Sequence, residues 1–204
     1  MLKERTKIAV FVSGGGTNLQ AILDAAAAGD LPDGEIALVL SSKADAYALE
    51  RAAKAGVKTA VVSKKECGSQ EAFEEAILAK LAEHGIEMIV LAGFMSILSE
   101  NFTSRFPRRI LNVHPSLIPS FCGKGFYGLK VHEAALAYGV KVSGATVHFV
   151  NEIPDGGEII AQTAVEILPG DTPEILQKRI MEQAEWILLP AAAETVAKEL
   201  REAK

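Results

Sequence analysis

Cysteine is scarce in this chain of 204 residues, and its two cysteines, Cys67 and Cys122, form no CxxC pattern. A disulfide framework needs more cysteines at regular spacings, so two free thiols in a reducing compartment are the simpler interpretation. No group of His and Cys has the spacing of metal ligands, so we expect no bound metal. Scarce cysteine thus favours a cytoplasmic protein without a structural zinc site.

Long apolar runs and basic runs are missing as well. The apolar stretch near the N-terminus is too short for a signal peptide, and no stretch reaches the length of a membrane span. The formal net charge is -5 and the sequence pI is about 5.5. A mildly acidic chain without a basic run is a poor candidate for nucleic-acid binding. We therefore expect neither a membrane nor a nucleic acid as partner.

What the chain does have is enough apolar material for one sizeable core. Hydrophobic residues make up 49% of the sequence and charged residues 23%, which is ordinary for a globular protein. No repeat, low-complexity tract or interdomain linker divides it. The sequence therefore predicts a single domain over residues 1–204.

Over the first half, short runs rich in Val, Ile and Leu alternate with longer runs rich in Ala, Leu and Glu. The short runs predict buried strands at Ile8–Val12, Ile36–Leu40, Thr59–Val62, Met88–Leu91 and Ile110–Val113. The longer runs predict helices at Asn18–Ala28, Ala46–Ala55, Gln70–His84 and Ile97–Phe106. This order implies parallel pairing with right-handed crossovers. The fold class is α/β, an open, doubly wound, mostly parallel Rossmann-like sheet.

The pattern changes after His114. Residues 115–128 contain three glycines and two prolines and predict a loop. The segments that follow predict a helix and two strands of an antiparallel extension, at Leu129–Tyr138, Ser143–Val150 and Ile159–Ile167. From about Thr172 the chain predicts a terminal helix, capped by Asp171 or Thr172 and kinked or broken at Pro190.

A glycine loop, Ser13-Gly14-Gly15-Gly16-Thr17-Asn18, joins the first strand to the first helix. Glycines allow close backbone approach, and the helix start presents free N–H groups, so the loop suits phosphate. No lysine follows as a Walker motif needs, and Leu19 stands where a dinucleotide site needs glycine. We interpret the loop as a monophosphate cradle to which Ser13, Thr17 and Asn18 add side-chain hydrogen bonds. The alternative is a structural turn with Thr17 as helix cap.

The segment Asn112-Val113-His114 ends a predicted strand, where ligands of open α/β sheets bind. Residues two apart on a strand face one side, so Asn112 and His114 converge and can donate hydrogen bonds to an oxyanion. A lone histidine is more often structural, and that alternative stays open for His114. We expect His84 and His132 to be surface or packing residues, and His148 to have a supporting role.

Asp155 lies in the stretch Pro154-Asp155-Gly156-Gly157. The simpler interpretation is a turn between strands. The functional interpretation is a carboxylate beside His114, which would help to hold the imidazole as the cation. Sequence alone does not choose between the two.

Four motifs in this order resemble one family over nearly the whole chain. They are Val12–Gln20, Leu91–Met95, Asn112–Pro119, and Val147–Val150 followed by Asp155-Gly156-Gly157. The resemblance is to the phosphoribosylglycinamide formyltransferases. It implies a single formyltransferase domain, with a phosphate-binding half at 1–114 and a folate and catalytic extension at 115–204.

The resemblance also implies substrates and residue roles. The substrates would be glycinamide ribonucleotide and 10-formyltetrahydrofolate, with no metal. The roles fall on three groups of residues. The catalytic ones would be Asn112, His114 and Asp155; those binding the substrate would be Gly16, Thr17, Asn18 and Glu185; those binding the folate would be Gln70, Met95, Ser96, Ile97, Leu98, Asn112, Asn151, Glu152, Ile153, Pro154 and Asp155.

This chain departs from the family pattern at several places. Ser96 and Gln70 occupy positions that are often basic, which bears on contacts to the folate tail. The loop Ser120–Leu129 is longer than usual. The count from Arg179 to Glu185 is one residue longer, so Glu182 is an alternative to Glu185.

Two other functions fit parts of the sequence. Another folate-dependent formyltransferase or hydrolase, such as the one acting on methionyl-tRNA, would share the Asn112–Pro119 segment, but it would bring a basic C-terminal module or an extra N-terminal domain. A non-catalytic phosphate-binding domain would explain only the glycine loop. A monomer and a homodimer are both compatible with the sequence.

Overall fold

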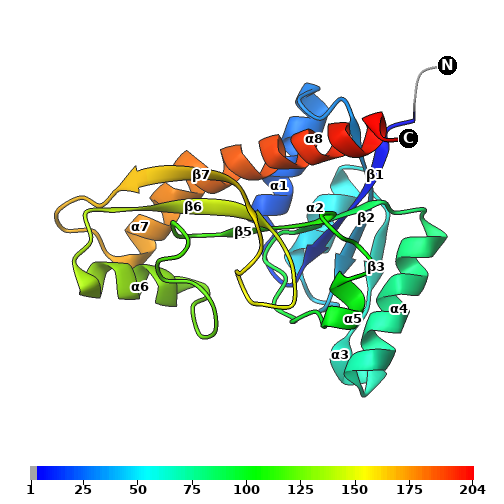
Figure 1. Cartoon of the computed structure of the whole chain (residues 1–204), viewed down its shortest axis with the longest axis horizontal. Coiled ribbons are helices and arrows are strands. Elements are labelled where there is room, and N and C mark those ends of the chain that lie inside the picture. The colour runs from blue at the N-terminus through cyan, green and yellow to red at the C-terminus, as the bar shows by residue number, and fades with distance from the viewer. Residues whose placement is uncertain (1–3) are drawn as a thin grey trace.

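A seven-stranded sheet with helices on both faces organises the chain, and the computed structural model describes residues 4–204 (Figure 1). The strand order is β3-β2-β1-β4-β5-β6-β7, in which β1 to β5 are parallel and β6 and β7 are antiparallel. The strands are β1 (Thr6–Val12), β2 (Gly34–Ser41), β3 (Thr59–Val61), β4 (Met88–Leu91), β5 (Ile110–His114), β6 (Val142–Phe149) and β7 (Ile159–Glu166). The predicted fold class is confirmed, including the antiparallel extension.

Helices connect most of the strands. They are α1 (Thr17–Ala28), α2 (Tyr47–Lys54), α3 (Lys64–Cys67), α4 (Gln70–Glu83), α5 (Glu100–Thr103), α6 (Leu129–Tyr138), α7 (Pro173–Ile180), the π-helical turn η1 (Met181–Glu185) and α8 (Trp186–Glu202). The short α3 is an addition to the predicted elements. The other helices of the parallel half, apart from α5, agree with the prediction to within two residues.

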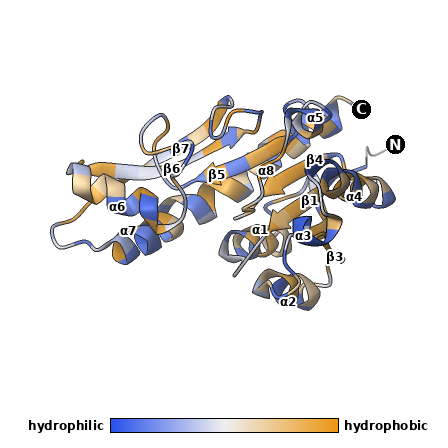
Figure 2. Ribbon diagram, turned by 90° about the horizontal axis from the view of Figure 1, so that it is seen from below, coloured by the Kyte–Doolittle hydropathy of each residue, from blue (hydrophilic) through white to orange (hydrophobic). Residues whose placement is uncertain are grey.

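The sheet separates two apolar cores, and its central strands stand out as apolar in Figure 2. On one face, α1, α7 and α8 cover side chains such as Val10, Val90 and Val147. On the other face, α4 and α5 cover Phe11, Leu40 and others. Because β1 and β4 are buried on both faces, they read as continuous apolar runs in the sequence.

The predicted helix Ile97–Phe106 is wrong at both ends. Only Glu100–Thr103 are helical, because the Ser99 hydroxyl accepts a hydrogen bond from Phe102 N and so fixes the helix start after residue 98. Ile97 and Leu98 therefore lie in an extended segment before the helix. The apolar residues of this segment resemble a helical pattern, but Ile97 and Leu98 belong to the loop that precedes α5.

The predicted break at Pro190 is also wrong. Pro190 lies inside α8, which continues from Trp186 to Glu202. The irregularity lies one turn earlier, where Met181–Glu185 form the π-helical turn η1. Pro190 is the fifth residue of α8. Its ring and its missing N–H therefore disturb the turn that joins η1 to α8.

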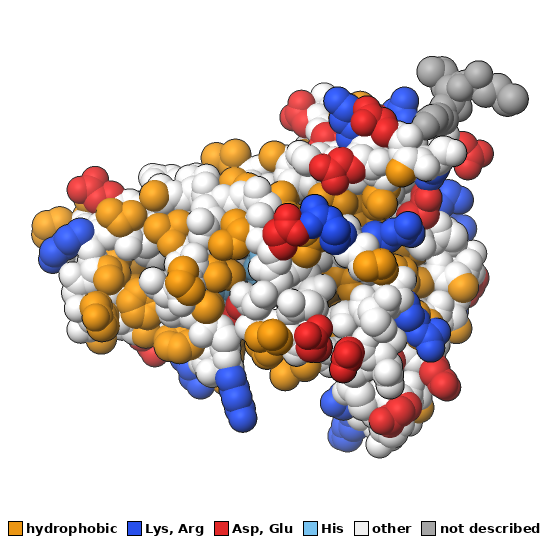
Figure 3. All heavy atoms as spheres, in the orientation of Figure 1, with side chains coloured by type: hydrophobic (Ala, Val, Ile, Leu, Met, Phe, Trp, Pro, Cys, Tyr) orange, Lys and Arg blue, Asp and Glu red, His pale blue; other side chains and the backbone are white. Residues whose placement is uncertain are grey.

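The surface is divided unevenly between the two halves of the molecule. On the face shown in Figure 3, apolar side chains gather over β6, β7 and α6, whereas Lys, Arg, Asp and Glu mingle over the parallel half. Large exposed apolar residues near α6 and β6 include Tyr138, Val142 and Tyr127. Within residues 4–204, none of the helices is both long and apolar enough to cross a bilayer.

The start of α7 supports a stability prediction. Thr172 caps the helix by accepting a hydrogen bond from Ile175 N, with Pro173 at the first position, as expected. Replacing Thr172 with alanine should lower the free energy of unfolding by about 1 kcal/mol, because one helical N–H loses its partner. Urea denaturation measures this change.

Thr195 on α8 is the matched control, since its hydroxyl bonds only to Ala191 O of its own helix. Thr195→Ala should leave the urea midpoint almost unchanged. Equal midpoints for the two variants would contradict the capping role of Thr172.

Candidate functional site

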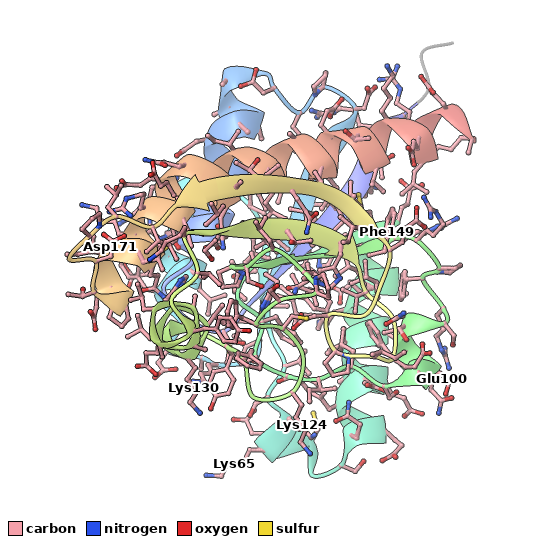
Figure 4. All side chains as sticks on the ribbon, turned by 60° about the vertical axis from the view of Figure 1, so that its left-hand side comes forward. Lys65, Glu100, Lys124, Lys130, Phe149 and Asp171 are labelled. Atoms are coloured by element: carbon pink, nitrogen blue, oxygen red, sulfur yellow. The ribbon has the colours of Figure 1, made fainter. Side chains whose placement is uncertain are left out.

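Three loops meet near the carboxyl ends of the parallel strands. The glycine loop follows β1, the segment 92–99 follows β4, and the loop 115–128 follows β5. The third loop, which carries Lys124, projects away from the sheet in Figure 4. The first two loops are joined by Ser13, whose hydroxyl accepts a hydrogen bond from Met95 N at 3.0 Å and bonds to Ser42 Oγ at 2.7 Å. Ser13 thus links the glycine loop to the segment 92–99 and to Ser42.

Asn112 and His114 face the same side of β5, as predicted from strand alternation. Val113 between them packs into the opposite core. In the antiparallel pairing with β6, Asn112 lies opposite His148 and His114 opposite Thr146. The Asn112 amide lies 3.2 Å from His148 Nε2. The pairing register therefore brings His148 beside the predicted site, where it supports Asn112.

Asp155 lies between the two histidines. One carboxylate oxygen is 3.5 Å from His114 Nδ1, and the other is 3.6 Å from His148 Nε2. Gly123 N donates a third interaction at 2.8 Å. Burial alone would raise the pKa of Asp155, but contact with His148, the Gly123 hydrogen bond and the charge of His114 outweigh it and lower that pKa. The carboxylate therefore stays ionised between the two rings.

Asp155 owes its position to an unusual backbone conformation. Its φ is 56°, in the left-handed region that few residues other than glycine adopt. The turn Asn151–Asp155 leaves the far end of β6 and folds back, so the carboxylate reaches His114. Such outliers often mark functional positions.

The His114 ring lies between two oxygen atoms. Its Nε2 lies 2.9 Å from the carbonyl oxygen of Phe121, and its Nδ1 faces Asp155. Both ring nitrogens thus face oxygen acceptors, and only the doubly protonated ring can donate to both. The carbonyl oxygen of Phe121, on the loop after β5, occupies the position beside His114 Nε2 where another oxygen could bind.

The glycine loop has the geometry of an anion cradle. Gly16 begins α1 with a φ of 73°, and no side chain caps the free N–H groups of the helix start. Thr17 is the first helical residue, so the alternative role of Thr17 as cap is not observed. Gly14 and Gly15 have open space around them, whereas Gly16 is pressed against Ala48 of α2.

Arg51 is a site residue that the sequence reasoning missed. From α2 its Nε donates to Gly15 O at 2.8 Å and its Nη1 to Gln20 at 3.0 Å, while the guanidinium lies over the Tyr47 ring. With Thr17 it lines a cavity of about 490 Å³ along α1. One indication of this role was present in the sequence, which is that Arg51 lies four residues after Tyr47 on a charged face of the helix.

Glu185 reaches the same region from the end of η1. It is 6% exposed, and Asn18 Nδ2 donates to its carboxylate at 2.7 Å. Burial raises the pKa of Glu185, and the Asn18 bond opposes that rise only in part. Glu182, the alternative, points outward and pairs with Lys178. The π-helical turn takes up the extra residue counted from Arg179 and turns Glu185 toward α1.

A separate cavity of about 130 Å³ lies beside Asn112. Nine of the eleven residues assigned to the folate line it, together with four that were not: Leu91, Phe94, His148 and Val150. Met95 and Gln70 do not line it. Met95 is 59% exposed, and the Gln70 amide donates to Ile97 O and to Glu74. Seven of its thirteen lining residues are apolar, and the polar ones are Ser96, Asn112, His148, Asn151, Glu152 and Asp155.

The site thus combines three chemical capacities. The glycine loop and Arg51 can bind an anion, Asn112 and His114 can donate hydrogen bonds to an oxygen that becomes negative, and Asp155 can exchange a proton. Within residues 4–204, no three His, Cys, Asp or Glu side chains are grouped as metal ligands would be. The arrangement suits group transfer to a phosphorylated acceptor without a covalent enzyme intermediate.

Comparison with known proteins gives consistent matches. A family model described as formyl transferase matches residues 6–192. The phosphoribosylglycinamide formyltransferase of Haemophilus influenzae is 46% identical over 87% of this chain and 81% of that protein. The trifunctional purine biosynthetic protein adenosine-3 of Gallus gallus is 44% identical over 95% of this chain, which spans only 18% of that protein.

A solved structure agrees with these relatives. The glycinamide ribonucleotide transformylase 1 of Symbiobacterium toebii is 43% identical to this chain and superposes with a TM-score of 0.89. The match covers 96% of this chain and 89% of the other. At this sequence identity, the similarity to the solved structure includes individual residues as well as the general architecture of the sheet.

Gly16 offers a test of the cradle geometry. A Cβ at this position would lie 2.6 Å from Ala48 Cβ, in addition to the strain of a positive φ. Gly16→Ala should therefore lower the free energy of unfolding by roughly 2 kcal/mol. Gly15→Ala, with nothing within 4 Å of its new Cβ, is the control and should unfold like wild type. A Gly16→Ala variant as stable as Gly15→Ala would show that contact with α2 does not constrain the glycine loop.

The position of His132 on α6 leads us to predict that the stability of the protein depends on pH. It is fully buried, and neither ring nitrogen has a partner among the described residues. Burial, with a smaller effect of the His114 charge, lowers the pKa of His132 from 6.5 to about 4. The unfolded ring takes up a proton near pH 6.5 and the folded ring only near pH 4, so stability falls as the pH drops through this window.

The expected loss from this one group is roughly 3 kcal/mol between the two pKa values. Urea denaturation of wild type and His132→Leu between pH 7 and pH 4 measures it, and the wild type should lose more stability. Parallel curves for the two proteins would refute the assignment of this acid sensitivity to His132.

Proposed function

Because the chain belongs to the formyl transferase family, we propose that it transfers the formyl group of 10-formyltetrahydrofolate to the amine of glycinamide ribonucleotide. The products are formylglycinamide ribonucleotide and tetrahydrofolate, in purine biosynthesis. The observation that carries the proposal is the grouping of Asn112, His114 and Asp155 at the carboxyl end of β5, beside the apolar cavity.

The acceptor binds through its phosphate and its polar sugar. The free N–H groups of Gly16, Thr17 and Asn18 hold the phosphate, and the Arg51 guanidinium adds positive charge beside them. Glu185 accepts hydrogen bonds from the acceptor as its carboxylate faces Asn18. In this proposal residues 1–114 supply the phosphate site together with Asn112 and His114, and residues 115–204 add Asp155, Glu185 and the donor contacts of the turn Asn151–Asp155, within one domain.

The donor binds with its ring in the cavity beside Asn112. Leu91, Phe94 and Leu98 offer apolar contacts, and the turn that ends at Asp155 closes the other side. The exposed apolar side chains of Met95 and Ile97, at 59% and 73% exposure, cover the more distant part of the donor. An apolar slot with a few polar groups is what a planar heterocycle needs.

The chemical step is an acyl transfer in which the protein handles charge and protons. As the acceptor amine attacks the formyl carbon, Asn112 and the cationic His114 donate hydrogen bonds to the formyl oxygen. For this, His114 Nε2 exchanges the Phe121 carbonyl for that oxygen. Asp155 takes the proton of the attacking amine and returns one to the leaving folate nitrogen. The new C–N bond thus forms as the amine attacks, and the bond between the formyl carbon and the folate nitrogen breaks when the tetrahedral intermediate collapses.

Loss of the His114 imidazole tests this assignment. His114→Ala should lower kcat by about a hundred- to a thousandfold, because the developing oxyanion loses a charged donor. The acceptor KM should change little, since the phosphate site is elsewhere. The absorbance of tetrahydrofolate as it forms gives the rate with glycinamide ribonucleotide as acceptor.

His84→Ala serves as the control, because His84 ends α4 far from β5. It should transfer formyl like wild type. A folded His114→Ala protein that keeps the wild-type kcat would remove His114 from the mechanism, and a wild type inactive on this substrate pair would remove the proposed reaction.

A further inference from the structure

A buried carboxylate that the proposed reaction does not use lies behind the donor cavity. Glu74, on the inner side of α4, is only 6% exposed. Its Oε1 accepts hydrogen bonds from Ser99 N at 2.6 Å and from Gln70 Nε2 at 2.5 Å, and its Oε2 accepts one from Ser99 Oγ at 2.5 Å. Burying a carboxylate is costly unless such bonds compensate it.

The partner of Glu74 belongs to the wall of the cavity. Ser96, Ile97 and Leu98 line the cavity and have no regular secondary structure. Ser99 ends this stretch and caps α5, whose first residue, Glu100, lies beside α4 in Figure 4. Gln70 adds a second tie, since its amide donates to Ile97 O at 3.1 Å. Two side chains of α4 therefore hold this segment. Glu74 binds Ser99 at its end, and Gln70 binds Ile97 in its middle.

The wall keeps an apolar side chain exposed at the mouth of the cavity. Ile97 is 73% exposed, although a free apolar segment would turn such a side chain inward. Ionic hydrogen bonds from a rigid helix can enforce this arrangement. The apolar side chain then stays available for a ligand at the mouth of the cavity.

From these contacts we propose that Glu74 is a positioning residue that sets the shape of the donor cavity. It touches no substrate and acts through Ser99 and the segment Ser96–Leu98. The inference rests on the proposed function, because it takes the folate as the occupant of the cavity. Disturbing Glu74 should weaken donor binding and leave the acceptor site at the glycine loop unchanged.

The test compares Glu74→Gln with Glu75→Gln. Gln keeps the size of Glu74 but loses the charge and one acceptor, whereas Glu75 is exposed on the same helix. Two readouts are needed. Equilibrium dialysis with tetrahydrofolate gives donor-site affinity, and steady-state rates give the KM of each substrate.

In the Glu74→Gln protein, tetrahydrofolate affinity should fall about tenfold and the donor KM should rise to match, because a displaced wall loses contacts along the whole ring. The acceptor KM and kcat should stay within about twofold of wild type. Glu75→Gln should match wild type in both assays. This split between donor and acceptor separates positioning from a general role in stability.

Ser99→Ala provides the second variant, should Glu74→Gln fail to fold. It keeps the Ser99 N–H bond to Glu74 but removes the hydroxyl bond, and it should show the same split. Wild-type affinity for tetrahydrofolate in the variant would overturn the inference, as would a parallel rise of both KM values. A wild-type protein that binds no tetrahydrofolate would overturn the proposed function itself.

Discussion

The half-buried carboxylate of Asp155 is the group on which the site depends. It is bound by His114 from β5, His148 from β6 and the Gly123 N–H from the loop between. An ionised group in this position must keep all its partners, because each lost partner leaves charge uncompensated. Two strands and one loop are therefore held in one arrangement, and the orientation of the His114 ring follows from it.

Local patterns were enough to predict one part of this arrangement. Strand alternation predicted that Asn112 and His114 face one side, and Val113 in the opposite core agrees. The glycine loop predicted a helix start open to anions. These features depend on residues near in sequence, whose geometry is set by backbone periodicity and by the freedom of glycine.

Contacts between distant residues could not be predicted in this way. The place of His148 depends on the register of β6 against β5, and the place of Asp155 on a turn that folds back with a positive φ. Arg51 and Glu74 bond to segments 25 or more residues away. The wrong helix over Ile97–Phe106 has in part the same origin, since Ser99 bonds to Glu74 of α4 as well as to Phe102 N.

The π-helical turn before α8 shows how a helix can change the direction of its side chains without a loop. Met181–Glu185 widen one turn, while α7 and α8 remain continuous on either side. The number of residues between two helical positions is then a poor guide to which way each side chain points. For chains related to this one, a gap of one residue in an alignment near Glu185 should be placed inside the helix, and the acid equivalent to Glu185 sought by its direction.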